Sequence, residues 1–206
     1  DTETTGVDMT RCELVGVSLS VAAGAGSYVP VEADSAEGWS LHRNSPEWHA
    51  LGHALSHTRA ELAAHNAKYD LGVLKRAGLP LDRIVYDTMI AQFLVDPVKR
   101  GGYGLKALAA EYFDWDMIEI GDLIGHGRQQ LSMRDVPIDL AAPYACADAD
   151  ATFQLVRVMK PRIAELNLQR LLDEVELPLV PVLVDMELSG VAIDTAHMAV
   201  LSREMT

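Results

Sequence analysis

Short apolar runs separated by turn residues occupy the first part of the chain and predict strands. Residues 12–22 (CELVGVSLSVA) and 27–32 (SYVPVE) are rich in Val and Leu with partial alternation, and the intervening Gly24-Ala25-Gly26 is typical of a hairpin turn. We therefore expect two antiparallel strands, followed by a polar loop at 34–44 and shorter strands at 61–65 and 84–86.

Helical signals dominate the remainder of the chain. Ser45-Pro46-Glu47 supplies an N-cap, a proline at the first helical position and an acidic first turn, which predicts a helix to about Thr58. Asp87 is interpreted as the N-cap of another helix. Further helices are expected from 67 to Gly78, over 88–94, around 105–112, over 138–147 and 149–166 with a break allowed between them, over 175–186 and from Thr195 onward.

This order of elements predicts the fold class. Strands come first, then strands alternate with helices, and the second half is helical. We expect an α/β domain with a mixed central β-sheet, helices on its faces and an antiparallel hairpin at the N-terminal end.

Composition fits one main domain with an appended piece. The 206 residues are 49% hydrophobic, enough for a substantial core. Two cysteines without a charged and apolar leader favour a reducing cytoplasm over a disulfide framework. No apolar run is long enough to span a membrane, and no pattern predicts self-association, so a cytoplasmic monomer is expected.

Charge argues against a free-standing nucleic-acid binder. The formal net charge is −13 and only 17 residues are Lys or Arg, whereas such proteins neutralise phosphates with clustered basic side chains. A metal-dependent nuclease, in contrast, needs carboxylates at its centre, and bound divalent cations invert the local charge where a phosphate lies.

Carboxylates at separate points of the chain suggest such a centre. Asp1 and Glu3 lie one residue apart on an extended segment, so both can contact one cation from the same side. If Asp70 and Asp148 join them, their mutual repulsion favours bound cations. Mg²⁺ and Mn²⁺ prefer such oxygen ligands, and two ions about 3.5–4 Å apart can stabilise the attacking and leaving oxygens of a phosphodiester.

Three polar residues near these carboxylates are candidates for further roles. Tyr144 precedes Asp148 by one helical turn, and its hydroxyl can orient an attacking water. Asn66 and Lys68 flank the Asp70 segment and are candidate substrate-binding residues; for Asn66, a role in fixing a turn stays open.

A row of histidines offers a different metal site. His49, His53 and His57 recur every four residues along one helix, a spacing that could hold zinc. A solvated helix surface is the preferred interpretation, because no Glu follows the first His to give the metalloprotease pattern.

Four passages carry a common signal: Asp1-Thr2-Glu3-Thr4, Asn66-Ala67-Lys68-Tyr69-Asp70, Tyr86-Asp87-Thr88-Met89 and Tyr144-Ala145-Cys146-Ala147-Asp148-Ala149-Asp150-Ala151-Thr152. Together they resemble the proofreading 3′–5′ exonuclease domain of family A (DNA polymerase I-like) DNA polymerases. The tail, with ELPLVPVL at 176–183 and SGVAID at 189–194, resembles the start of that family's polymerase domain. We therefore expect an exonuclease domain at 1–170 and a truncated polymerase domain at 171–206, cut from a longer polypeptide.

The resemblance implies a ribonuclease H-like three-layer fold and an enzyme that removes nucleotides from single-stranded or frayed DNA 3′ ends with two divalent ions, Mg²⁺ or Mn²⁺. By position, Asp1, Glu3 and Asp148 would bind the tighter ion. Asp1 would bridge to a second ion that Asp70 holds largely through water, while Tyr144 positions the nucleophile. The polymerase domain of the same parent chain would be its partner.

One position departs from the family pattern: Ala147 stands where a Glu is frequent, which removes a contact to substrate or water but no metal ligand. Two alternatives remain. Ribonuclease D-like enzymes share these motifs and trim RNA, although the polymerase-like tail speaks against them. The other alternative is a non-catalytic scaffold whose carboxylates are surface charge.

Overall fold

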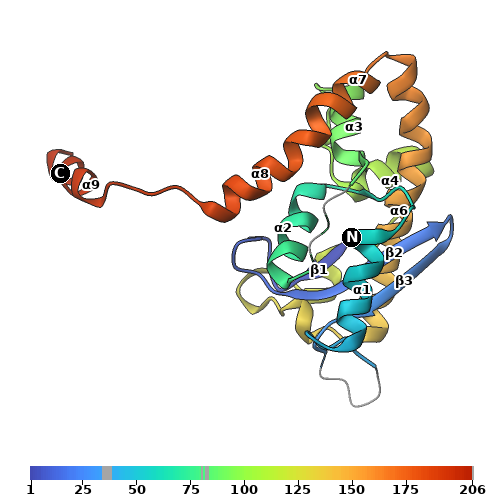
Figure 1. Cartoon of the computed structure of the whole chain (residues 1–206), viewed down its shortest axis with the longest axis horizontal. Helices are drawn as coiled ribbons and strands as arrows, with labels where there is room; N and C mark the ends of the chain where they lie inside the picture. The colour runs from blue at the N-terminus through green and yellow to red at the C-terminus, as the bar shows by residue number, and fades with distance from the viewer. Residues whose placement is uncertain (34–38, 80, 82–83, 206) are drawn as a thin grey trace.

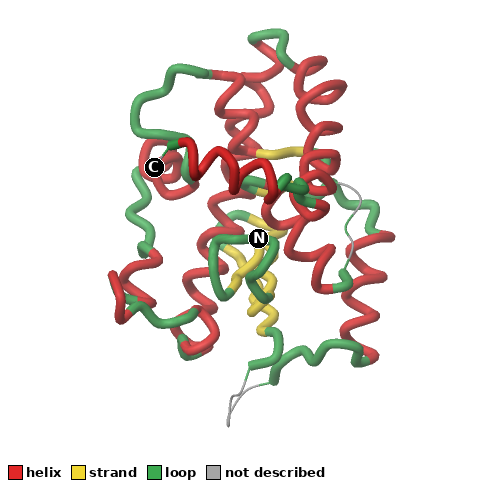
Figure 2. The backbone as a smooth tube through the Cα atoms, turned by 90° about the vertical axis from the view of Figure 1, so that its left-hand side faces the viewer, coloured by secondary structure: helices red, strands yellow, loops and turns green. Residues whose placement is uncertain are grey.

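The strands form the centre of the molecule. The computed structural model describes residues 1–33, 39–79, 81 and 84–205, so part of the expected polar loop at 34–44 lies outside the described residues. Strands β1 (Thr2–Thr4), β2 (Leu14–Ala22) and β3 (Ala25–Pro30) form an antiparallel sheet in that order, and β4 (Ala63–Ala64) pairs in parallel with β5 (Tyr86–Asp87). Helices surround these strands (Figure 2).

The predicted α/β class is confirmed, but the strands differ from the expected spans: β3 covers 25–30 where 27–32 was expected, and the short strands β4 and β5 cover 63–64 and 86–87 where 61–65 and 84–86 were expected. The described strands divide between two small sheets, one antiparallel and one parallel, and do not form a single mixed sheet. The hairpin turn consists of Ala23 and Gly24, one residue earlier than expected, and Gly24 supplies the positive φ of 76° that the tight turn needs.

Most helices lie close to the expected spans. The described helices are α1 (Pro46–His57), α2 (Ala67–Ala77), α3 (Thr88–Val95), α4 (Leu105–Phe113), α5 (Ile120–Ile124), α6 (Ile138–Glu165), α7 (Gln169–Leu171), α8 (Leu177–Ser189) and α9 (Thr195–Glu204), with short 3₁₀ turns at Gly127–Gln129 and Met133–Asp135 and a π-helical turn at Leu172–Glu176. Of these, α5 and α7 were not among the expected helices, and α8 begins and ends two to three residues later than expected. In this described part of the chain, every helix is too short or too polar to cross a lipid bilayer.

Helix α6 is the longest element and organises the core. It lies along β2 and β3, and α3 and α4 pack against it (Figure 1). The close approach to β3 depends on Gly26, where an added Cβ would lie 2.6 Å from the Cβ of Cys146. The break allowed near residue 148 is absent, because α6 runs unbroken from residue 138 to 165. Its continuity keeps Tyr144 and Asp148 one turn apart on one rigid helix.

Two large apolar clusters flank this framework. Leu14, Val17, Trp48, Val73 and Leu74 belong to a cluster that joins β2 to α1 and α2. A second cluster joins α3, α4 and α6 through residues such as Leu108, Leu155 and Met159. Burial of these side chains is the main force that fixes the positions of α2 and α6 relative to the sheet.

Helix α8 packs on the outside of α2. Val180 and Val184 are buried against Ala67 and Leu71, and beyond Gly190 the chain leads away from the body to α9 (Figure 1). The assignment of residues 171–206 to the beginning of a polymerase domain stays a proposal.

Asp87 is an N-cap, as predicted, and it also connects two helices. Its carboxylate accepts hydrogen bonds from the backbone N–H groups of Met89 and Ile90 at 2.8 and 3.1 Å, and from those of Ala67 and Asn66 at 2.7 and 3.3 Å. The side chain is buried, with the residue 1% exposed. The starts of α2 and α3 are therefore held by one group.

Replacing Asp87 with Ala should lower the free energy of unfolding by roughly 3 kcal/mol, because four backbone donors lose their acceptor in a buried setting. Urea denaturation followed by circular dichroism measures the change. Asp194→Ala is the matched control: Asp194 also caps a helix, through the N–H of His197 at 2.9 Å, but its site is exposed, and about 1 kcal/mol or less is expected. Equal losses in the two variants would contradict a connecting role for Asp87.

Candidate metal centre

Three carboxylates from the two ends of the domain meet beside the sheet. Oxygen atoms of Asp1, Glu3 and Asp148 lie within 4.8 Å of one another. Asp1 and Glu3 flank Thr2 on β1, so the alternation of a strand places both side chains on one face, while α6 supplies Asp148. The start of β1 is held by its pairing with β2, where the N–H of Ser18 donates to the Asp1 carbonyl at 3.0 Å.

A fourth carboxylate, Asp70, reaches the same place from α2. Its Oδ1 accepts a hydrogen bond from the Thr2 hydroxyl at 2.6 Å, and its buried Oδ2 has no partner among the described residues. The four acids share a cavity of about 310 Å³, lined by Asp1, Thr2, Glu3, His65, Asn66, Tyr69, Asp70, Met89, Gly104, Leu105, Tyr144 and Asp148. The structure thus brings together all five residues predicted as catalytic.

Without a cation, burial makes the ionised form of these carboxylates unfavourable. Burial first, and then the charge of Asp148, raises the pKa of Glu3 to about 7. Burial likewise raises the pKa of Asp70 and that of Asp148. Four carboxyl groups in one cavity, one of them with a free buried oxygen, match the oxygen ligands that Mg²⁺ and Mn²⁺ prefer, so the residues present fit divalent cations.

The raised pKa of Glu3 predicts how stability depends on pH in the absence of metal. The unfolded chain releases this proton near pH 4.5, whereas the folded state holds it to about pH 7. The folded state therefore binds more protons in this window, and the free energy of unfolding should fall as pH rises through it, by roughly 3 kcal/mol at most.

Melting temperatures in chelator between pH 4.5 and 8 check this expectation. Glu3→Gln should flatten the decline, and Mn²⁺ should raise the wild-type melting temperature more at pH 8 than at pH 5. An unchanged slope in Glu3→Gln would show that other groups control the pH dependence.

Tyr144 lies on the wall of the cavity. Burial, and then the charges of Asp148 and Glu3, raise the pKa of its phenol, so the hydroxyl stays protonated at neutral pH. A cation that sequence reasoning missed lies beside it: the Lys106 ammonium is 3.9 Å from the centroid of the Tyr144 ring and 3.2 Å from Asp148 Oδ1. The sequence marks Lys106 only as a polar position on an amphipathic helix.

The two predicted substrate-binding residues differ in position. Asn66 lines the cavity and occupies the N-cap position of α2 with a left-handed φ of 66°, so it does fix a turn there. Lys68 is outside the cavity lining and forms an ion pair with Glu187 of α8. A contact of either residue with substrate remains a proposal.

His65 is a further cavity residue that sequence reasoning missed. Its Nδ1 lies 2.8 Å from the Thr88 hydroxyl, and its Nε2 is buried with no partner in the described part of the chain. Burial lowers the pKa of the imidazole to about 4, so the ring is neutral at physiological pH. The sequence signal that could have identified His65 as a cavity residue is its position directly before Asn66.

The histidine row on α1 keeps its helix-surface interpretation. The rings of His53 and His57 stack with centroids 4.1 Å apart, and His57 Nδ1 lies 3.0 Å from the His53 carbonyl oxygen. The ring nitrogen of His57 thus already has a backbone partner.

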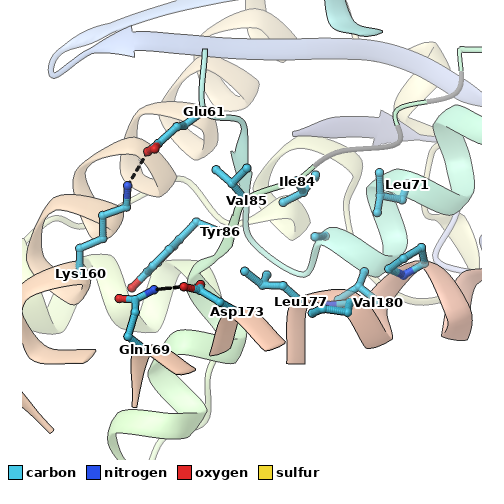
Figure 3. A pocket seen from close by; sticks show the side chains of 13 residues that line it. Glu61, Leu71, Ile84, Val85, Tyr86, Lys160, Gln169, Asp173, Leu177 and Val180 are labelled. Carbon is cyan, nitrogen blue, oxygen red and sulfur yellow. Dashed lines mark hydrogen bonds and ion pairs between the residues drawn. The ribbon is translucent and has the colours of Figure 1, made fainter. Parts of the chain in front are cut away.

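A larger cavity of about 500 Å³ lies under α8 (Figure 3). Four of its polar side chains form two pairs, Lys160 with Glu61 at 2.6 Å and Gln169 with Asp173 at 2.9 Å, whereas the buried Tyr86 hydroxyl has no partner among the described residues. The remaining lining is largely apolar, from residues such as Leu71, Leu177 and Val180. The acidic cavity is the better candidate for chemistry.

Comparisons with known proteins point in one direction. A family model described as 3′–5′ exonuclease matches residues 1–164. The chain is 34% identical to DNA polymerase I of Pseudomonas aeruginosa, over 100% of this chain and 23% of that protein. It is 38% identical to DNA polymerase I of Chloroflexus aurantiacus, over 98% of this chain and 21% of that protein. The chain therefore spans less than a quarter of the length of these relatives.

Solved structures share the fold. The POL domain of Pol1 from M. smegmatis in complex with DNA primer-template and dNTP has a TM-score of 0.71 and 23% identity, over 94% of this chain and 29% of that one. Brucella melitensis NrnC with bound Mg²⁺ has a TM-score of 0.70 and 22% identity, over 96% and 88% of the two chains. These likenesses confirm the expected ribonuclease H-like fold.

Proposed function

Because the chain belongs to the family of 3′–5′ exonuclease domains that includes the corresponding region of DNA polymerase I, we propose that it hydrolyses the terminal phosphodiester of DNA 3′ ends, with two divalent cations, as the proofreading activity of a polymerase. The substrate would be a single-stranded or frayed 3′ end.

One observation carries this proposal: four carboxylates, from Asp1 and the adjoining strand β1, from α2 and from α6, line a single cavity. Glu3, Asp70 and Asp148 are each less than 10% exposed. This burial also argues against the scaffold alternative, because carboxylates kept only as surface charge would lie in water.

The geometry of the cluster supports a proposed division of the ligands between two ions. Asp1, Glu3 and Asp148 are close enough to hold one ion together. Asp70, through its unpartnered Oδ2, would help to hold a second, with Asp1 between the two. When bound, the ions supply positive charge to the phosphate oxygens and acidify water.

Tyr144 acts on the attacking water. Its protonated hydroxyl is hydrogen-bonded to Asp148, and its oxygen can accept a hydrogen bond from the water, which would hold the water in line with the bond that breaks. The attack forms a bond from the water oxygen to phosphorus and breaks the bond to the 3′ oxygen of the preceding nucleotide. The products are a nucleoside 5′-monophosphate and a chain shortened by one residue.

A 5′-labelled DNA oligonucleotide tests the proposal. We expect stepwise shortening from the 3′ end with Mg²⁺ or Mn²⁺ and none in chelator. A matched RNA oligonucleotide tests the ribonuclease D-like alternative. This alternative gains some support from the fold likeness to Brucella melitensis NrnC, which has been solved bound to pGG. Faster shortening of RNA would favour that alternative, and no shortening of either strand would refute the nuclease assignment.

A further inference from the structure

Lys106 brings a positive charge into contact with the acidic cluster from outside the cavity. Its Nζ donates to Asp148 Oδ1 at 3.2 Å and to the carbonyl of Ile118 at 2.6 Å. The neighbouring Gly104 and Leu105 line the cavity, but Lys106 itself does not. Its side chain is 17% exposed, so this contact is made with little competing water.

The same ammonium also holds an aromatic ring. Lys106 Nζ lies 3.9 Å from the centroid of the Tyr144 ring, within the range of a cation–π interaction. Tyr144 and Asp148 lie one turn apart on α6, so a single cation from α4 contacts both of them. Its third contact, to Ile118, fixes the ammonium in this position.

From these contacts we propose that Lys106 is the built-in counter-ion of the acidic cluster and the positioning residue for Tyr144. This inference rests on the proposed function. In the metal-free protein the ammonium compensates part of the carboxylate charge. When cations bind at Asp148, Lys106 repels them, while its cation–π contact keeps the Tyr144 ring against the cavity.

The counter-ion role and the positioning role of Lys106 predict that Lys106→Met binds Mn²⁺ more tightly and turns over more slowly. Lys106→Met keeps the length of the side chain but removes its charge. The variant should bind Mn²⁺ about fivefold more tightly, because a competing positive charge has left the site. It should also turn over at least about tenfold more slowly, because the Tyr144 hydroxyl is no longer held in line. KM for the oligonucleotide should change less than about twofold, since Lys106 lies outside the cavity lining.

Electron paramagnetic resonance of free Mn²⁺ measures binding, and shortening of a 5′-labelled oligonucleotide gives kcat and KM. Lys106→Arg should restore both properties toward wild type, because a guanidinium keeps the charge and stacks on aromatic rings. Lys99→Met is the charge-matched control. Lys99 pairs with Glu111, which lies on α4 like Lys106, and the Mn²⁺ affinity and kcat of this variant should stay at wild-type values.

Weaker Mn²⁺ binding together with a lower melting temperature in Lys106→Met would reveal a purely structural residue and overturn the proposal. Unchanged Mn²⁺ affinity and unchanged kcat would overturn it as well. If the wild-type chain shortens no oligonucleotide, the proposed function fails, but the Mn²⁺ titrations still decide whether Lys106 is a counter-ion.

Discussion

Replacing Asp148 with Asn should reduce kcat of the 3′–5′ exonuclease by roughly 10³-fold, a loss of about 4 kcal/mol in transition-state stabilisation. Asp148 is the α6 member of the acidic cluster, and an amide is a poor substitute for a carboxylate as a ligand of Mg²⁺ or Mn²⁺. Single-turnover shortening of a labelled oligonucleotide at saturating Mn²⁺ measures the loss of the chemical step.

The same substitution should stabilise the metal-free protein. Burial raises the pKa of Asp148, so at pH 8 its ionised form costs folding free energy that an amide does not. Asp150→Asn is the matched control on the same helix. The Asp150 carboxylate accepts hydrogen bonds from the Gly24 N–H at 3.0 Å and from Gln154 at 3.1 Å, outside the cavity. Its variant should lose stability and keep kcat, and the reverse pattern would argue against a metal ligand at Asp148.

Replacing Tyr144 with Phe should reduce kcat by roughly 10²-fold, because the hydroxyl proposed to orient the attacking water is lost while the ring remains. Mn²⁺ affinity should stay unchanged, since Tyr144 is not one of the clustered carboxylates. This separates the role of Tyr144 from that of Asp148, whose variant should lose both turnover and metal binding.

Tyr112→Phe serves as the control, because Tyr112 donates its hydroxyl hydrogen bond to Gln92 at 2.8 Å, away from the cavity. Its kcat should match that of the wild-type chain. A Tyr144→Phe variant with wild-type kcat would show that the phenol does not act on the water.

Local signals predicted most helix boundaries. Ser45 caps α1 through the N–H of Trp48 at 3.1 Å, as expected from its own neighbours in the sequence. A cap is a contact across three residues, so short-range patterns suffice. The sequence left open whether the helix breaks near residue 148; α6 is continuous there, packed along β2 and β3.

Contacts between residues far apart in the sequence were harder to predict. The alternation of a strand predicted that Asp1 and Glu3 share a face, and the family resemblance added Asp70 and Asp148. The partners of the lysines were not predictable. Lys68 meets Glu187, 119 positions away, and Lys106 meets Asp148, 42 positions away, because tertiary packing alone decides such pairs.

Helix α2 faces the acidic cavity on one side and α8 on the other. Asp70 points into the cavity, whereas Lys68 and Lys75 form ion pairs with Glu187 and Asp185 of α8. Only one residue, Tyr69, lies between Asp70 and Lys68, which forms the nearer ion pair. A tilt of α8 would therefore move the backbone that carries Asp70. A domain attached beyond α8 could change the distances between the carboxylates through this contact.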